Sequence, residues 1–181
     1  MKQIQLSKKS KRYPEPIYAL VDDEDYEMLM KWNWCVYKNG NNLYAARGNS
    51  ANSEFRTTHM HRVIMNSPKG LSVDHIDHNG LNNQKSNLRN CTQAQNQWNK
   101  AGIVDATSKY KGVCLATCKN PHITKKGVRR EYVYYRWRAD IVCNKKHYWL
   151  GFFKTQEEAA KAYNEKAKEL HSDFAVLNII N

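Results

Sequence analysis

The residues best suited to catalysis lie in the middle of the chain, where an acid and a histidine adjoin. A short apolar run leads into Asp74 and His75, and a stretch dense in asparagine and glycine follows. A second short strand is predicted over 87–91, after which Thr92 can cap a helix. The predicted order is therefore strand, asparagine-rich loop, strand and helix, with Asn96 one turn into the helix.

These side chains suit the hydrolysis of a phosphodiester. That reaction needs a base to deprotonate water and a divalent cation to offset developing charge. Histidine is the natural base near neutral pH, and carboxylate and amide oxygens are ligands that suit Mg²⁺. Adjacent residues point to opposite sides of a regular strand, so Asp74 and His75 reach one phosphate only where the strand bends into the loop.

Residues 60–100 carry the pattern MHR…VDHI(D/N)…N…NN…SNLR…T…QN. The pattern resembles the HNH nuclease family, whose fold is a ββα-metal finger, and especially the homing endonucleases encoded by phages and introns. The resemblance implies that Asp74 is a metal ligand and His75 the general base. It also implies that Asn87 braces the loop between the strands and contributes to catalysis, and that Asn96 is the second metal ligand. Many members have histidine at this last position, and asparagine there favours Mg²⁺ or Mn²⁺ over zinc.

Basic residues near this motif have two interpretations each. His61 and Arg62 match the His-Arg pair that precedes the finger in the family, where a structural role and a phosphate contact are both open. Arg89 can contact the scissile phosphate or pair with a neighbouring acid. His78 stands where the family often has glycine, and a solvated loop histidine is favoured over a spare base.

The residues before the motif, 1–58, are expected to form a β-rich platform. An apolar strand is predicted over 17–21, and the acids after it suit the first turn of a helix. Aromatic-rich strands are predicted over 32–37 and 43–47, joined by a hairpin turn at Asn39-Gly40. The tryptophans are expected in the core, with DNA contact by the hairpin as the alternative.

The last part of the chain, 107–181, has a different pattern. Strands are predicted over 134–143 and 147–151, and Thr155 with Glu158 forms a capping box that opens a helix. The motifs YKGV, WRADI, WLG and EEAA-x-AY resemble the plant ethylene-response-factor (apetala-two) DNA-binding domain. The resemblance implies three antiparallel strands that enter the major groove, with the helix behind them.

Several side chains of this part are candidates for DNA contact. The resemblance gives Lys111 and Trp149 a contact role, whereas His147 replaces an arginine of the plant proteins, so base specificity cannot be carried over. Arg136 and Arg138 are additional positive charges, and Arg138 can instead face the helix.

Residues 118–133 make the first turn longer than in that family and contain a basic cluster. Such a loop near a groove-binding sheet is expected to contact phosphate, with a solvated loop as the alternative. The predicted DNA contacts are Lys111, Arg129, Arg130, Arg136, Arg138, His147 and Trp149, with His61, Arg62 and Arg89 as candidate phosphate contacts at the finger.

The spacing of Cys114, Cys118, Cys143 and His147 also permits a zinc site. On the predicted strands the first two cysteines face the DNA side and Cys143 faces the helix. These ligands are therefore not expected to converge.

Charge supports a nucleic-acid partner. The 181 residues include 29 Lys and Arg and 17 Asp and Glu, so the net charge is 29 − 17 = +12. Residues 1–106 contribute 14 − 10 = +4 and residues 107–181 contribute 15 − 7 = +8. No apolar run approaches the roughly 18 residues of a membrane span, and the N-terminus lacks the apolar region of a secretory signal. Five scattered cysteines fit a reducing compartment.

We expect an α+β protein with a platform at 1–58, a ββα-metal finger and linker at 59–106, and a reader module at 107–181. The predicted function is a site-specific, homing-type endonuclease that uses Mg²⁺ or Mn²⁺ on double-stranded DNA. It is expected to be a monomer in the cytoplasm of a bacterium or phage-infected host, without a targeting signal or membrane contact. The alternatives are a non-catalytic transcription regulator and a restriction- or toxin-type nuclease of low specificity.

Overall fold

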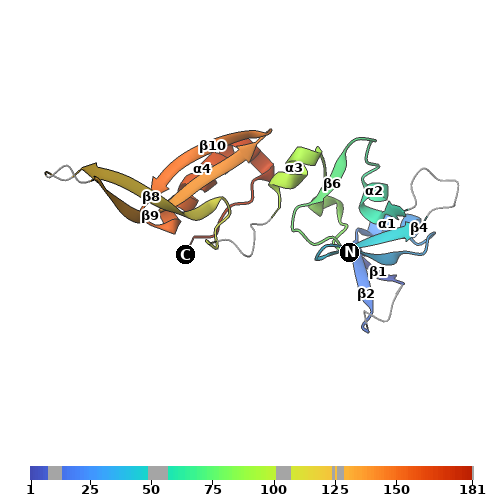
Figure 1. Cartoon of the computed structure of the whole chain (residues 1–181). Coiled ribbons are helices and arrows are strands. Elements are labelled where there is room, and N and C mark those ends of the chain that lie inside the picture. The colour runs from blue at the N-terminus through green and yellow to red at the C-terminus, as the bar shows by residue number, and fades with distance from the viewer. Residues whose placement is uncertain (8–13, 49–56, 101–106, 124, 126–128, 181) are drawn as a thin grey trace. The chain divides into compact units, whose positions relative to one another are not determined.

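The computed structural model describes residues 1–7, 14–48, 57–100, 107–123, 125 and 129–180. The chain forms two compact units, Met1–Asn96 and Gln97–Asn181. Each unit combines small antiparallel sheets with few helices, which confirms the α+β prediction (Figure 1). The predicted linker spans 101–108, and its residues 101–106 lie outside the described residues. Among the helices of the described part, none is long and apolar enough to cross a membrane.

The first unit begins with a two-stranded sheet and a helix. β1 (Lys2–Leu6) pairs antiparallel with β2 (Ile17–Val21), and α1 (Asp23–Leu29) follows with three acids in its first turn. Negative charge there suits the positive end of the helix dipole. Trp34 is buried in the core, and its indole Nε1 donates to the carbonyl oxygen of Leu29 at 2.9 Å. The predicted core position of this tryptophan is confirmed.

A second sheet in this unit has the order β3-β4-β5 and consists of β3 (Cys35–Asn39), β4 (Asn42–Gly48) and β5 (Thr57–His59). The predicted hairpin between the first two strands is present. Gly40 adopts a φ of +59° in its turn, which is a conformation that favours glycine. The strand predicted from residue 32 begins only at Cys35, because the tryptophans before it turn into the core instead of pairing.

The elements of the finger follow the predicted order. They are α2 (Met60–Ile64), β6 (Ser72–His75), η1 (Lys85–Asn87), β7 (Leu88–Cys91) and α3 (Gln93–Trp98). β6 and β7 form a two-stranded antiparallel sheet. The hydroxyl of Thr92 accepts from the backbone N–H of Gln95 at 3.2 Å, as expected for the residue that caps α3.

The second unit is a three-stranded sheet backed by one helix. Its elements are β8 (Val113–Ile123), β9 (Arg129–Cys143), β10 (Lys146–Phe153), α4 (Gln156–His171) and η2 (Ser172–Phe174), and the strand order is β10-β9-β8. The small side chains of Ala159, Ala160 and Ala167 are buried, so the helix lies close to the sheet. The predicted capping box between Thr155 and Glu158 is present.

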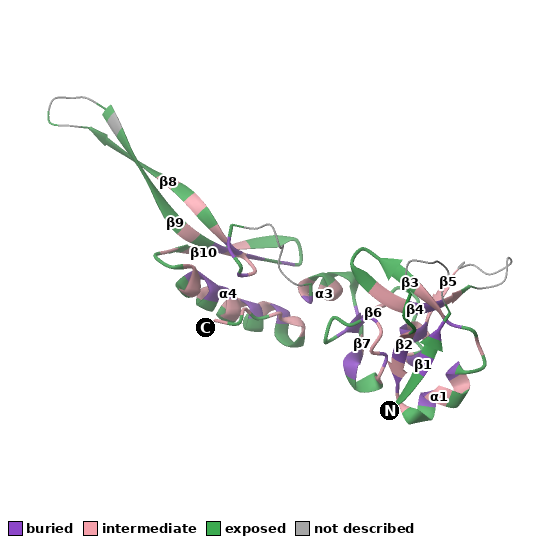
Figure 2. Ribbon diagram, turned by 90° about the horizontal axis from the view of Figure 1, so that it is seen from below, coloured by how far each residue is buried: buried purple, intermediate pink, exposed green. Residues whose placement is uncertain are grey.

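One region of this unit differs from the expectation. The segment 118–133, predicted as a long turn, is largely strand, because β8 and β9 continue beyond the part of β9 that pairs with β10. We call the paired residues 116–123 and 129–136 the arm, which projects past α4 and is mostly exposed (Figures 1 and 2). The sequence Tyr-Val-Tyr-Tyr at 132–135 has the high strand propensity that the basic residues obscured.

Candidate active site and nucleic-acid surface

Asp74 and His75 end strand β6, as the sequence indicates, and both are buried. Their exposed fractions are 5% and 6%, and the register pairs Asp74 with Arg89 and His75 with Leu88 on β7. A buried carboxylate is costly unless a positive charge pairs with it. Oδ2 of Asp74 accepts a hydrogen bond from Nε of Arg89 at 2.9 Å, and an Nη atom of the same guanidinium lies 2.8 Å away. Arg89 therefore fixes the orientation of the carboxylate.

Asn87 holds the loop between the two strands. Its Oδ1 accepts from the backbone N–H of Asp77 at 3.0 Å, and its Nδ2 donates to Oδ1 of Asp77 and to the carbonyl oxygen of Asn82, both at 2.9 Å. These three bonds close the loop on the end of β6. Burial opposes ionisation of Asp77, but hydrogen bonds from Asn82, Asn79 and Asn87 together lower the pKa of this carboxyl.

Two further residues position this loop, and neither was singled out in the sequence. A Cβ atom at Gly80 would lie 2.4 Å from the carbonyl oxygen of Leu43 and 2.6 Å from the ring of Tyr44, so only glycine fits against β4. Asp77 joins the network described above. In the sequence, both residues lie in a stretch dense in Asp, Asn and Gly over 77–83. Such a stretch is typical of side chains that bond to nearby backbone, and it is the signal that could have identified them.

Aromatic rings surround His75. The ring of Tyr44 lies 5.8 Å from it and that of His61 5.0 Å, and His61 in turn stacks on His59 at 5.2 Å. Burial lowers the pKa of His75, and burial lowers the pKa of His61 to about 2. Both imidazoles are therefore neutral at neutral pH, which is the form that a base requires.

The three candidate phosphate contacts of the finger have internal partners. His61 is buried, and Arg89 pairs with Asp74. The guanidinium of Arg62 donates to the carbonyl oxygens of Leu71, Ser67 and Pro68 at 2.8, 3.3 and 3.3 Å. The structural interpretation that the sequence left open for each therefore has contacts to support it. His78 is exposed in the loop with a φ of +63°.

The predicted metal ligands are a buried carboxylate and a half-buried amide. Asp74 ends β6 and Asn96 lies on α3, in the same unit. Oxygen donors of this kind suit a hard cation such as Mg²⁺, so the donor set fits the predicted ion. Within the described ranges no group of three His, Cys, Asp or Glu is placed to hold a metal.

In the second unit, several predicted DNA contacts share the sheet face opposite α4, which we call the outer face. Nε of Arg138 lies 2.9 Å from Oδ2 of Asp140, and Nε2 of His147 lies 3.1 Å from Oδ1 of the same residue. Arg138 thus lies on the outer face, and the alternative that it faces the helix is wrong. Trp149 pairs with Asp140 across the sheet and is 61% exposed.

The remaining predicted contacts are distributed between the arm and the base of the sheet. Arg129 and Arg136 are exposed on β9, and Arg130 pairs with His122 in the register, although its side chain lies outside the described part. Nζ of Lys111 instead donates to the carbonyl oxygens of Trp98 and Lys100, at 2.7 and 2.6 Å.

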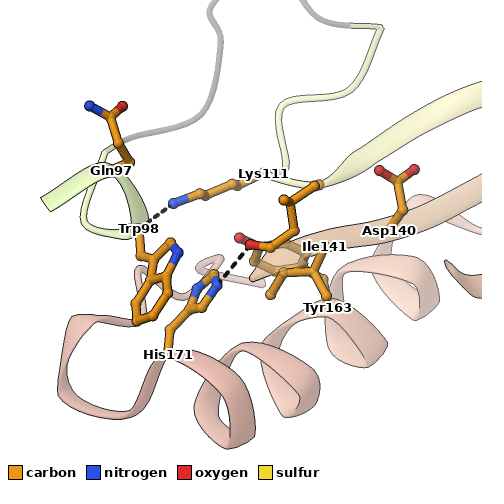
Figure 3. A pocket seen from close by; sticks show the side chains of 9 residues that line it. Gln97, Trp98, Lys111, Asp140, Ile141, Tyr163 and His171 are labelled. Carbon is orange, nitrogen blue, oxygen red and sulfur yellow. Dashed lines mark hydrogen bonds between the residues drawn. The ribbon is translucent and has the colours of Figure 1, made fainter. Parts of the chain in front are cut away.

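Lys111 lines a pocket in which Trp98 stacks on His171, with ring centroids 4.6 Å apart and planes inclined by 6° (Figure 3). Burial lowers the pKa of Lys111 to about 8. Its ammonium group satisfies the carbonyl groups of Trp98 and Lys100, which belong to the same unit as Lys111, and a contact to DNA requires it to leave them.

The cysteines considered for zinc lie on two faces. Cys143 is buried on the α4 side, where its Sγ contacts the carbonyl oxygen of Leu170 at 3.6 Å. Cys114 pairs with Arg138 and Cys118 with Tyr134, so both belong to the outer face.

Comparisons with known proteins agree with the finger. Residues 59–98 match the family model described as HNH endonuclease. The chain is 31% identical over 166 residues to an Acanthamoeba polyphaga mimivirus protein named as an uncharacterized HNH endonuclease, covering 91% of this chain and 76% of that one. It is also 31% identical over 108 residues to Protein 3.8 of Escherichia phage T7, covering 60% of this chain and 76% of that protein. No solved structure matches. With its Asp-His pair, braced loop and capped helix inside the matched segment, this chain belongs to the HNH endonuclease family.

Proposed function

We propose that this protein hydrolyses a phosphodiester bond of double-stranded DNA, with His75 as the general base and Asp74 and Asn96 as ligands of Mg²⁺ or Mn²⁺. The observation that carries the proposal is the buried Asp74-His75 pair at the end of β6. It lies within the segment that matches the HNH endonuclease model, beside a loop that Asn87 closes.

Each residue of this chain has a separable task. The neutral imidazole of His75 accepts a proton from the attacking water, and the rings of Tyr44 and His61 restrict how it can turn. Arg89 holds the carboxylate of Asp74, and Asn87 holds the loop that borders the histidine. Asp74 and Asn96 would hold a divalent ion, which would supply positive charge to offset the charge that develops on the phosphate and the leaving 3′ oxygen.

The second unit supports targeting of the chain to DNA. Two thirds of the net charge, +8 of +12, falls within residues 107–181. The outer face presents Arg138, His147 and Trp149, which suit phosphate and base contacts. The resemblance to the ethylene-response-factor domain gives the same sheet face this role. We therefore assign reading to residues 107–181, cleavage to 59–106 and a supporting platform to 1–58.

A homing role follows from the resemblance to phage and intron enzymes. The part of the chain that the structure describes has one finger, which implies one active site, so a monomer cuts one strand and leaves a nick. Cleavage of both strands requires two copies.

The test is cleavage of supercoiled plasmid by the full chain with Mg²⁺ or Mn²⁺, compared with the His75→Ala variant and with wild type in excess EDTA. We expect nicked circles from the wild type alone. Intact supercoiled plasmid at every salt and metal concentration contradicts the nuclease proposal and leaves the DNA-binding regulator. A ladder of random fragments supports the nuclease and rejects site specificity.

A further inference from the structure

The arm has no core of its own. Its aromatic side chains are exposed, with fractions of 59% for Tyr132, 42% for Tyr134 and 62% for Tyr135. Two-stranded ribbons are marginal in water, and the neighbouring exposed rings of Tyr132 and Tyr134 indicate a surface that binds a partner.

The register separates the side chains of the arm into two faces. Tyr132, Tyr134 and Arg136 alternate along β9, so they share one face, and we call them the arm row. Cζ of Arg136 lies 5.3 Å from the centroid of the Tyr134 ring, and the ring of His122 lies 5.9 Å from that of Tyr132. No register shift occurs between β8 and β9, so the row continues the outer face that carries Arg138.

The opposite face of the arm has a different character. Lys119 pairs there with Glu131 at 3.2 Å, which balances both charges, and Val133 and Tyr135 lie beside them. The arm residues 116–123 and 129–136 contain four basic residues and one acid, a net charge of 4 − 1 = +3, and Glu131 is that acid. The arm row therefore combines a guanidinium and phenol groups on a face without a carboxylate of the arm.

We infer that the arm row lies in a groove of duplex DNA, beside the segment contacted by the three-stranded sheet. The inference rests on the proposed function, because it takes the same duplex as partner. The major groove is about 12 Å wide and admits a two-stranded ribbon. The paired part of the arm is about 25 Å long, so it follows the groove for roughly seven base pairs. The guanidinium and the phenol hydroxyl groups donate to phosphate oxygens, and the +3 charge of the arm complements the duplex.

The experiment measures binding of the full chain to a fluorescein-labelled 40-base-pair duplex of mixed sequence, in EDTA so that no cleavage occurs. The arm-row variant carries Tyr132→Ala and Tyr134→Ala, and a third protein carries Arg136→Ala. The matched control carries Val133→Ala and Tyr135→Ala, which removes exposed side chains of the same strand from the opposite face. Circular dichroism melting checks that all variants are folded.

We expect the arm-row variant to bind about tenfold more weakly, with the control within twofold of the wild type. Arg136→Ala should lower the slope of log affinity against log salt by about 1, as loss of one phosphate contact does. Equal affinity for all variants overturns the inference, and so does an equal loss in the control. Binding of a labelled single strand that is tighter than the duplex and sensitive to the same row also overturns it.

The failure of this inference and the failure of the proposed function give different results. A wild type that cuts plasmid but whose arm variants bind normally rejects the arm row alone. A wild type that neither binds the duplex nor cuts plasmid at low salt rejects both.

Discussion

The basic side chains of the two units are used in opposite ways. In the first unit, Arg62 and Arg89 point inward and donate to carbonyl and carboxylate oxygens of the finger. In the second, Arg136 and Arg138 stay exposed on the outer face. Residues of the same type thus fix the geometry of the candidate site in one unit and present charge in the other. A site for chemistry requires a fixed arrangement, whereas a surface that holds DNA requires accessible charge.

Two ion pairs of the same chemical type show this most directly. In the pair of Arg89 with Asp74 the side chains are 18% and 6% exposed, and in the pair of Arg138 with Asp140 they are 44% and 22% exposed. The N–O distances are nearly equal, at 2.8 and 2.9 Å. Burial, together with the second nitrogen by which Arg89 contacts its carboxylate, therefore distinguishes the expected energetic weights of the two pairs.

The largest expected effect is on folding. Arg89→Ala leaves the carboxylate of Asp74 buried without its guanidinium, and breaking a buried pair in this way costs about 3 kcal/mol or more. Arg138→Ala, the matched control, should cost less than about 1 kcal/mol because water screens the exposed pair. Urea denaturation of both variants measures the difference. Similar losses in the two would contradict the contrast between the units.

A somewhat smaller loss is expected from Asn87→Ala. The substitution removes three hydrogen bonds, and each contributes about 1 kcal/mol, so the free energy of unfolding should fall by about 2–3 kcal/mol. Plasmid cleavage should fall with it, because the loop beside His75 loses its closure. Asn90→Ala provides the control, since Asn90 is exposed on the adjacent strand. An Asn87 variant as stable and active as this control would refute the bracing role.

Acid should destabilise the finger through His61. Burial holds its folded-state pKa at about 2, below the ordinary value of 6.5, with the charges of His75, His59 and Arg62 acting in the same direction. The contribution of His61 to the free energy of unfolding is fully present above pH 6.5. It declines as pH falls, because the histidine of the unfolded chain is protonated first. The loss is about 1.4 kcal/mol per pH unit, or about 2 kcal/mol at pH 5.

The measurement is the free energy of unfolding at pH 7.5 and pH 5, for the wild type and for His61→Leu. The variant should show a smaller decrease on acidification, although burial also lowers the pKa of His59 and His75. Parallel decreases in the two proteins would show that His61 does not titrate in this way.

The smallest effect concerns DNA affinity. Arg138→Ala removes one exposed charge from the outer face and should weaken binding of a 40-base-pair duplex about three- to fivefold. Arg62→Ala should change affinity less than twofold, because its guanidinium is bonded to backbone carbonyls. Fluorescence anisotropy in EDTA compares the two variants. A greater loss for Arg62→Ala would place phosphate contacts at the finger after all.

Local patterns were sufficient to predict most elements. The capping box of α4, the hairpin at Asn39-Gly40 and the order of strands and helix in the finger each depend on residues close in sequence. The strands over 118–133 were missed because their Tyr and Val residues lie within a basic segment that was read as a loop, although the two strands that pair are separated by only residues 124–128. Strand pairing is decided by partners, and a single segment does not specify them.

The sequence by itself determined which chemical groups are available: the Asp-His pair, the asparagines of the finger and the excess of basic residues after residue 107. Only the tertiary structure decided which of those groups are already engaged. Arg89 pairs with Asp74 across two strands, and Lys111 donates to the end of α3. The physical reason is that burial and hydrogen bonding depend on residues brought together from separate segments. An arginine of this chain is therefore engaged as a structural partner or left accessible on the surface according to what packs beside it.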